Sequence, residues 1–433
     1  MSHQWTIRVE HGIMVRPEFF YIMHGVMNMH FYSRTRAEKL EQLQNEITRT
    51  IETGIECSML PGACVGLYQS GKPLYEAAIG QADREKKLPM KIDTLFRMFS
   101  MTKPVTAMAV MQLWEHGRLD LAHPLSWYFP EYKNMLVDTG HGLVPAEREI
   151  TIQDLLNMTS GIPYPDCWCE SQKQMAQFYD EINARLGSDK PVSTEEFCRR
   201  AGGVPLMFHP GEKWAYGASA DVLGGVVEAV SGMPFDEYLK ENIFQPLGME
   251  DTDFYVPEEK RSRFAQLYTW DNENGGIRVE PDPHLGMNDY LTKPAFISGG
   301  AGLISTLSDY AAFANTLACG GRHPGLGVRL IGERTWKYMQ SPQLTPKQKQ
   351  SVEWESLIGH SYGNLMRVLE SPGVFCTNAP AGEFGWDGWT GTYMTVCPEH
   401  ELAIVYLIQN CGAGTSDIVR KIRTIAYGAI DTE

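Results

Sequence analysis

Two segments with the pattern of paired β-strands lie near opposite ends of this 433-residue chain. The first, GACVGLYQSGKPLYEAAIG over residues 62–80, predicts two strands joined by a turn at residues 70–72. The second, TGTYMTVCPEHELAIVYLIQN over residues 390–410, predicts two more strands with a turn at residues 398–400. We therefore expect one sheet built from both ends of the chain, with the long middle inserted as a second lobe.

Helical patterns flank both strand pairs. From about Arg34 to Gly54 the sequence predicts an amphipathic helix that ends at the glycine. Its apolar stripe is formed by Leu40, Leu43, Ile47 and Ile51. A final helix is predicted over about residues 415–427.

This order of elements predicts three parts of the chain. Residues 34–119 and 294–433 are expected to form a sheet domain of the α/β class (α+β type). Residues 120–293, which are rich in helical patterns and in Pro and Gly breaks, are expected to form an inserted, mainly helical domain. Residues 1–33 carry no assignable pattern and are interpreted as an N-terminal arm.

Composition restricts the class of protein. A hydrophobic content of 43% and a charged content of 21% are those of an ordinary globular chain. The net charge of −15 argues against a nucleic acid or an anionic membrane as partner. Nine scattered cysteines without a C-x-x-C pair argue against a disulfide framework and a zinc site. Without a long apolar run or a recognisable signal peptide, the sequence predicts a cytoplasmic location.

A serine and a lysine stand one helical turn apart in an otherwise apolar run, FSMTKPVTAMAVMQLWEHG, which begins at Phe99. This is the single Ser-x-x-Lys in the chain, and it places Ser100 at the start of a helix with Lys103 below it. Two interpretations stay open at this point. Ser100 could cap the helix while Lys103 extends to solvent. Alternatively, a lysine whose pKa is lowered by burial could act as the base for a nucleophilic serine.

The motifs of several other enzyme classes are missing. The sequence has no G-x-S-x-G, no H-E-x-x-H and no Walker loop. Two further segments could accompany the Ser-x-x-Lys. FHPGEKWAYGASADVLG places Tyr216 just before a helix that starts near Ser219, and GEFGWDGWTGTY is rich in glycine and leads into a strand.

Five stretches together resemble the serine β-lactamase and penicillin-binding-protein superfamily. They are most similar to its branch of class C β-lactamases, D-aminopeptidases and family VIII carboxylesterases, over about Arg34 to the C-terminus. The stretches, in the family's order, are FSMTKPVTAMAVMQLWEHGRLDL, ITIQDLLNMTSGIPY, FHPGEKWAYGASADVLG, SGGAGLISTLSDYAAFA and FGWDGWTGTY. The resemblance implies a β-lactamase/transpeptidase-like fold, in which helices flank an antiparallel sheet and a mainly helical lobe is inserted.

The resemblance also implies catalytic roles. Ser100 would be the acylated nucleophile, Lys103 its proton acceptor, and Tyr216 a general base or proton relay. That last role asks for a phenol whose pKa is lowered by a nearby cation, for which Lys103 is the candidate. The backbone N–H groups of Ser100 and Trp389 would form the oxyanion hole. No metal or organic cofactor is expected.

Two positions depart from the β-lactamase pattern. Trp386-Asp387-Gly388 replaces Lys-Thr-Gly, and Ala218 stands where an asparagine would hold the substrate amide, with Ser219 as a candidate substitute. The loss of a cation in favour of an indole points towards neutral esters. The predicted substrate-binding residues are Trp386, Asp387, Gly388, Tyr164, Trp168 and Ala218.

The sequence therefore predicts a serine hydrolase that acts as a carboxylesterase on small neutral esters through an acyl-enzyme. A β-lactamase, a D-amino-acid-specific peptidase, an acyltransferase that uses the same residues, and a non-catalytic binding homologue are the alternatives. The expected partner is a small-molecule ester or acyl substrate, and the sequence makes no prediction of the oligomeric state.

Overall fold

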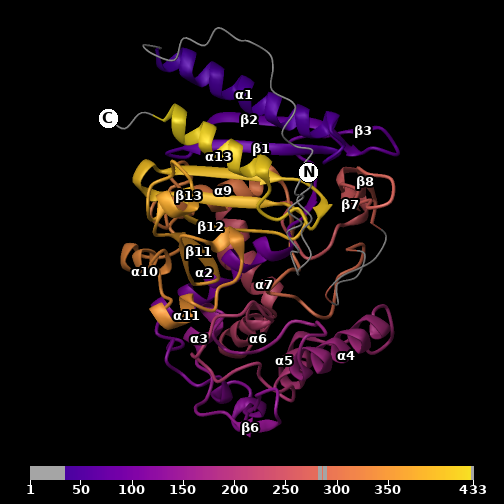
Figure 1. Ribbon diagram of the computed structural model, residues 1–433, viewed down its shortest axis with the longest axis vertical. Coiled ribbons are helices and arrows are strands. Elements are labelled where there is room, and N and C mark those ends of the chain that lie inside the picture. Colours follow the sequence, from indigo (N-terminus) through magenta and orange to yellow (C-terminus); the bar gives the residue numbers. More distant parts are fainter. Residues whose placement is uncertain (1–34, 281–284, 286–289, 431–433) are drawn as a thin grey trace, which may run out of the picture.

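A central antiparallel sheet joins the two ends of the chain (Figure 1). The computed structural model describes residues 35–280, 285 and 290–430, so the predicted arm over 1–33 lies outside the described residues. The strand order is β10-β11-β12-β13-β14-β1-β2-β3. The bounds are β1 Gly62–Gln69, β2 Lys72–Asp83, β3 Leu88–Pro89, β10 His360–Gly363, β11 Met366–Leu369, β12 Phe384–Asp387, β13 Tyr393–Cys397 and β14 Leu402–Leu407.

The pairing of β1 with β14 confirms that one sheet is built from both ends. Their antiparallel register runs from Cys64 opposite Leu407 to Gln69 opposite Leu402. Seven of the eight residues of β1 are buried, which explains its almost continuous apolar sequence. A strand covered on both faces needs apolar side chains on both.

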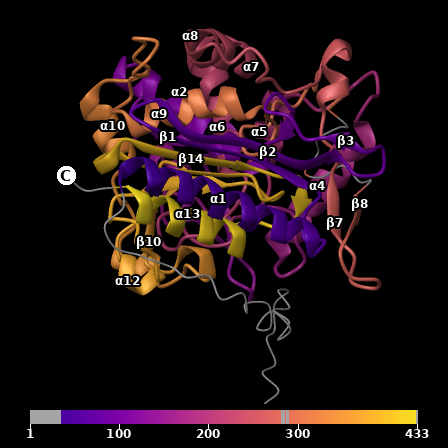
Figure 2. The ribbon, with the colours of Figure 1, turned by 90° about the horizontal axis from the view of Figure 1, so that it is seen from above.

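Helices cover both faces of this sheet (Figure 2). On one face lie α1 (Arg36–Glu56) and α13 (Asp417–Ala429), which pack on each other. On the other face lies α9 (Leu307–Ala318), in contact with β1, β13 and β14. Helix α1 passes through Gly54 and ends at Glu56, so the predicted end at the glycine is wrong. The missing side chain of Gly54 instead lets Leu60 and Ile418 approach the helix closely.

The rest of the chain packs beside the sheet as a helix-rich region, visible below it in Figure 1. Its elements are α3 (Ile152–Leu156), α4 (Glu170–Arg185), α5 (Thr194–Ala201), α6 (Ser219–Ser231), α7 (Phe235–Leu239) and α8 (Gln245–Leu247), with the hairpin β5 (Leu136–Asp138) and β6 (Leu143–Pro145). Strands β7 (Tyr268–Trp270) and β8 (Ile277–Val279) form a small sheet with β15 (Asn410–Cys411). The middle of the chain thus also contributes strands, and the domain boundaries proposed from the sequence stay a prediction.

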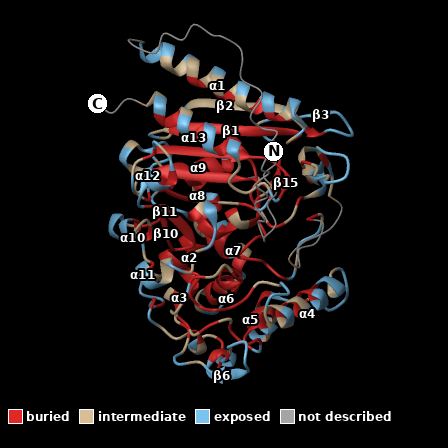
Figure 3. Ribbon diagram, viewed as in Figure 1, coloured by how far each residue is buried: buried red, intermediate tan, exposed pale blue. Residues whose placement is uncertain are grey.

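Short elements complete the fold. They are β4 (Phe96–Arg97), β9 (Ile304–Ser305), α10 (Glu333–Met339), α11 (Pro346–Lys349) and α12 (Pro372–Phe375). The largest buried cluster extends from the face of the sheet that α9 covers into the helix-rich region. The buried segments in both parts are red in Figure 3.

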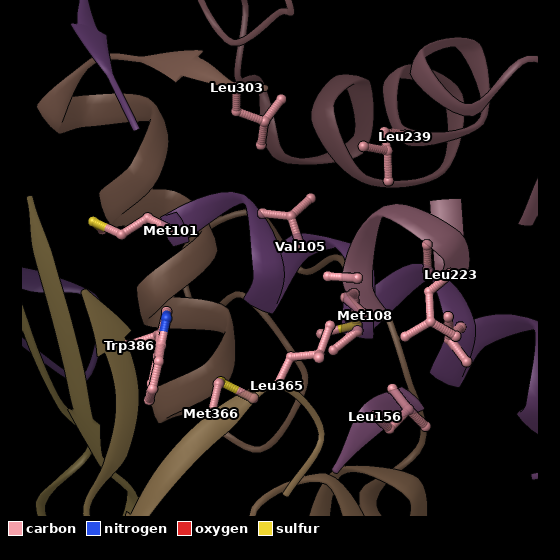
Figure 4. Packing of buried hydrophobic residues seen from close by; sticks show 14 of the residues in the cluster. Met101, Val105, Met108, Leu156, Leu223, Leu239, Leu303, Leu365, Met366 and Trp386 are labelled. Atoms are coloured by element: carbon pink, nitrogen blue, oxygen red, sulfur yellow. The ribbon is translucent and has the colours of Figure 1, made fainter. Parts of the chain in front are cut away.

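Helix α2 (Thr102–Glu115) passes through the centre of this cluster. Every residue of α2 from Thr102 to Leu113 is buried. Figure 4 shows Met101, Val105 and Met108 of this segment packed among side chains from several other elements. A helix enclosed on all sides removes any polar side chain on it from water.

Candidate active site

Ser100 lies in a tight turn between a short strand and the central helix. Strand β4 pairs with β9, a 3₁₀ turn spans Phe99–Met101, and α2 begins at Thr102. Phe99 has a φ of 45°, a left-handed conformation that is costly for a bulky residue. Met101, rather than Ser100, is the N-cap residue of α2, so the serine does not act as a helix cap.

Lys103 is fully buried beneath this turn. Its Nζ donates hydrogen bonds to Ser100 Oγ at 3.1 Å, to the Tyr164 hydroxyl at 3.1 Å and to the carbonyl oxygen of Gly300 at 2.8 Å. With 0% of its surface exposed, the lysine does not extend to solvent. The structure therefore excludes the capping-and-snorkelling interpretation.

Burial makes the amine of Lys103 a weaker base than that of a lysine in water. Desolvation lowers the pKa of Lys103 to about 7, although the carboxylates of Asp221 and Asp387 act in the opposite direction. About half of the Lys103 side chains are then neutral at pH 7. A neutral amine at 3.1 Å from Ser100 Oγ can accept the hydroxyl proton.

Tyr216 also lies beside Ser100, in the turn that leads into α6. Its hydroxyl accepts a hydrogen bond from Trp386 Nε1 at 3.1 Å and interacts with the Ser100 side chain. Lys103 Nζ lies 4.5 Å from the centre of the Tyr216 ring. Burial raises the pKa of Tyr216, which corrects the expectation that Lys103 would lower it. The cause is the burial of the phenol, which outweighs the hydrogen bonds with Ser100 and Trp386 that act to lower this pKa.

Asp221 is a site residue that the sequence analysis missed. Its Oδ2 accepts a hydrogen bond from the Tyr164 hydroxyl at 3.2 Å, and its Oδ1 accepts one from the Gly300 N–H at 3.0 Å. Ser298 Oγ also donates to Oδ1. Asp221 thus fixes two of the three hydrogen-bond partners of Lys103, namely Tyr164 and Gly300. The signal available in the sequence was an acidic residue in the first turn of the helix after Tyr216, and in the structure Asp221 is only 1% exposed.

Asp387 has a partner that the sequence did not reveal. Arg367 on β11 donates from Nη1 to Asp387 Oδ1 at 2.5 Å, and the arginine side chain is 3% exposed. Burial raises the pKa of Asp387, while Arg367 acts to lower it. Asp387, held by Arg367, is thus a carboxylate at the middle position of the segment that replaces the Lys-Thr-Gly motif of the β-lactamase pattern.

The turn after β12 touches the segment that carries Ser100. Thr392 Oγ1 donates to the carbonyl oxygen of Met98 at 3.1 Å, and the Trp389 ring meets Phe99 edge-on at 5.4 Å. A Cβ on Gly388 would lie 2.4 Å from the Met98 oxygen, so only glycine permits this approach. The contact brings residues 388–389 beside Ser100, and the N–H groups of Ser100 and Trp389 remain the predicted oxyanion hole.

The remaining predicted substrate-binding residues lie in different environments. Trp386 is 2% exposed and contacts Tyr216, and Ala218 is fully buried at the start of α6. Trp168 is 70% exposed, four residues beyond Tyr164. The hydroxyl of Ser219 is hydrogen-bonded to Ser160 at 2.8 Å in the interior, so it does not substitute for the missing asparagine.

Neither a metal cluster nor a membrane helix is found in the described part of the chain. Among those residues, no three His, Cys, Asp or Glu side chains gather as metal ligands would. None of the described helices is both long and apolar enough to cross a bilayer. The cytoplasmic location stays a prediction.

Comparison with known proteins identifies the family. A family model described as Beta-lactamase matches residues 47–427, a range that contains all the site residues described above. The chain is a serine hydrolase of the beta-lactamase family. This confirms the resemblance and the fold class that the sequence motifs indicated.

The chain is also similar to individual known proteins. Esterase EstB of Burkholderia gladioli is 33% identical over 370 residues, which cover 82% of this chain and 88% of the relative. The structure of EstCE1 aligns with a TM-score of 0.74 at 24% identity, over 90% of this chain and 99% of that one. Simvastatin synthase (LovD) from Aspergillus terreus aligns with a TM-score of 0.73 at 21% identity, over 92% and 98%. The two solved structures support the fold.

Proposed function

We propose that this beta-lactamase-family serine hydrolase is a carboxylesterase that forms an acyl-enzyme on Ser100. The observation that carries the proposal is the hydrogen bond from the buried amine of Lys103 to Ser100 Oγ, 3.1 Å, beside Tyr216. The 33% identity to a protein named Esterase EstB supports the same reaction class.

Acylation starts from the neutral form of Lys103. Ser100 Oγ attacks the ester carbonyl carbon while its proton passes to Lys103 Nζ. The carbonyl oxygen becomes an oxyanion, which the N–H groups of Ser100 and Trp389 stabilise. The carbon–oxygen bond to the alcohol then breaks, and the proton returns to the leaving oxygen from Lys103 through the Tyr216 hydroxyl.

Deacylation repeats these steps with water. Water attacks the acyl carbon, its proton passes to Lys103, and the proton returns to Ser100 Oγ as the acid is released. Because burial keeps Tyr216 protonated, its hydroxyl relays protons and Lys103 is the base. Asp221 and Tyr164 act as positioning residues that hold the lysine.

Neutral esters fit this site better than lactams or peptides with a free carboxylate. The lysine with which the β-lactamase pattern holds a substrate carboxylate is replaced here by Trp386, and the neighbouring Asp387 adds a carboxylate instead of a cation. Because Arg367 already pairs with Asp387, the described residues offer no free cation at this position to attract an anionic substrate. Transfer of the acyl group to an alcohol is the second candidate, because EstCE1 is described as a hydrolase with promiscuous acyltransferase activity and LovD as simvastatin synthase.

The test is intact-protein mass spectrometry after brief exposure to p-nitrophenyl butyrate and, separately, to benzylpenicillin. We expect turnover or a butyryl adduct with the ester, lost in Ser100→Ala, and little reaction with penicillin. An added alcohol that diverts the acyl group from water would establish transferase activity. A stable penicillin adduct on Ser100, or full esterase activity in Ser100→Ala, would overturn the proposal.

A further inference from the structure

A tryptophan that the sequence analysis did not single out lies against Tyr216. The Trp354 ring is centred 4.8 Å from the Tyr216 ring and 6.3 Å from the Trp386 ring, on which it stacks at 23°. Its edge-on contact with Trp214 is 5.5 Å. Even so, Trp354 is 41% exposed, whereas Trp386 is 2% exposed and Trp214 is 4% exposed. Trp354 is thus the most exposed of the three tryptophans in this aromatic cluster.

The loop that carries Trp354 is fastened to the turn that carries Tyr216. Ser351 Oγ accepts a hydrogen bond from the Trp214 N–H at 2.8 Å, and Gln348 Nε2 donates to the Gly211 carbonyl oxygen at 2.8 Å. These bonds join residues 137 positions apart. They hold the indole beside the tyrosine before any substrate arrives, which reduces the entropy lost on binding.

The proposed reaction indicates that the alcohol group of the ester lies near Trp354. The leaving oxygen must come within hydrogen-bond distance of the group that returns its proton. Lys103 is 0% exposed and surrounded by Ser100, Tyr164 and Gly300, so the Tyr216 hydroxyl is the group that the oxygen can reach. The alcohol substituent then extends past the Tyr216 ring, towards the exposed part of Trp354.

We propose that Trp354 forms the wall of a subsite for the alcohol group of the ester, and that this subsite favours aromatic alcohols. The inference rests on the proposed esterase function. An aryl group packed against an indole gains buried apolar area and the preference of aromatic rings for one another. In this arrangement the acyl group extends from the other side of the ester bond, so Trp354 should affect acylation and not the later hydrolysis of the acyl-enzyme.

The test compares benzyl acetate, ethyl acetate and ethyl phenylacetate with wild type and Trp354→Ala. We expect kcat/KM for benzyl acetate to fall about tenfold in Trp354→Ala, while the values for both ethyl esters stay within about twofold. The hydrolysis rate of the acetyl-enzyme should not change, since the alcohol has left. Trp354→Phe should keep most of the preference for benzyl acetate.

Trp127→Ala is the matched control, because Trp127 is 67% exposed and packs on His123 instead of the Tyr216 cluster. It should leave all three values of kcat/KM unchanged. An equal loss for benzyl and ethyl acetate, or a loss confined to ethyl phenylacetate, would overturn the subsite while leaving the esterase intact. A wild-type protein that hydrolyses none of the esters would overturn the proposed function, and the subsite with it.

Discussion

The carbonyl oxygen of Gly300 accepts a hydrogen bond from Lys103 Nζ at 2.8 Å, across 197 positions of the chain. The same glycine donates its N–H to Asp221 Oδ1 at 3.0 Å, so one peptide segment orients both the amine and the carboxylate of the site. A Cβ on residue 300 would lie 2.6 Å from both Asp221 Oδ2 and the Tyr164 hydroxyl. Glycine is required here by the closeness of these polar neighbours.

Gly300→Ala should therefore damage the site. The added methyl must displace Tyr164 or Asp221, and overpacking of this kind typically costs about 1–3 kcal/mol. We expect kcat/KM for p-nitrophenyl butyrate to fall more than about tenfold, because misplacement of catalytic groups is costly. Gly373→Ala is the control, since nothing lies within 4 Å of a Cβ there. Equal thermal stability and activity in the two variants would contradict the prediction.

The activity should depend on pH through Lys103. Its pKa of about 7 means that lowering the pH protonates the amine and removes the proton acceptor. We expect kcat/KM to fall about tenfold per pH unit below the midpoint and to level off above it. The measurement is a pH–rate profile under kcat/KM conditions with an uncharged ester. A profile that stays flat from pH 5 to 8 would contradict this assignment.

Asp387→Asn should move that midpoint to lower pH. The Asp387 carboxylate raises the pKa of Lys103, and its removal also leaves the Arg367 cation without its partner. Both changes disfavour the ammonium form of the lysine. The unpaired buried arginine should destabilise the fold by about 3 kcal/mol, measurable by urea unfolding. A midpoint that moves upward would show that Asp387 does not act on Lys103 in this way.

Tyr216→Phe should lower kcat/KM by a factor of about 10²–10⁴ while the protein stays folded. Trp386→Phe removes the hydrogen bond from the indole to the Tyr216 hydroxyl together with part of the ring that stacks on Tyr216, and should lower kcat/KM roughly fivefold. In the Tyr216→Phe background, Trp386→Phe should have little further effect on kcat/KM, because its hydrogen-bond acceptor is already gone. Additive losses in this double-mutant cycle would show that Trp386 acts independently of the tyrosine.

The last prediction concerns the stability of the fold and a buried ion pair that takes no part in the proposed reaction. Arg423 donates to Glu383, which also accepts a hydrogen bond from the Tyr427 hydroxyl at 2.9 Å, and both charged side chains are 2% exposed. Glu383→Gln should lower the free energy of unfolding by about 3 kcal/mol, since it leaves a buried cation unpaired. The midpoint of the pH–rate profile should not move. A shifted midpoint with unchanged stability would contradict both statements.

The sequence predicted the elements whose patterns are local. Of the predicted stripe, Leu43, Ile47 and Ile51 are buried in α1, whereas Leu40 is only half-buried. Both strand pairs form where the sequence predicted them. The turn that carries Ser100 and the helix below it also lie where the Ser-x-x-Lys motif indicated. Local patterns succeed because apolar periodicity and turn residues act over a few neighbouring positions.

The contacts that set the chemistry were not available to such patterns. Arg367 is one charged residue in a short strand, Trp354 lies in an irregular loop, and the acceptor from Gly300 is a backbone carbonyl that every residue possesses. The raised pKa of Tyr216 also follows from its burial, which the sequence around it does not record.

By itself the sequence determined the sheet from both chain ends, the family, and the residues that could react, because these depend on side-chain order along the chain. Only the tertiary structure decided that Lys103 is dry, that Tyr216 stays protonated, and that Asp387 is paired with Arg367. The physical reason is that pKa values depend on the removal of water and on charges brought together from distant segments.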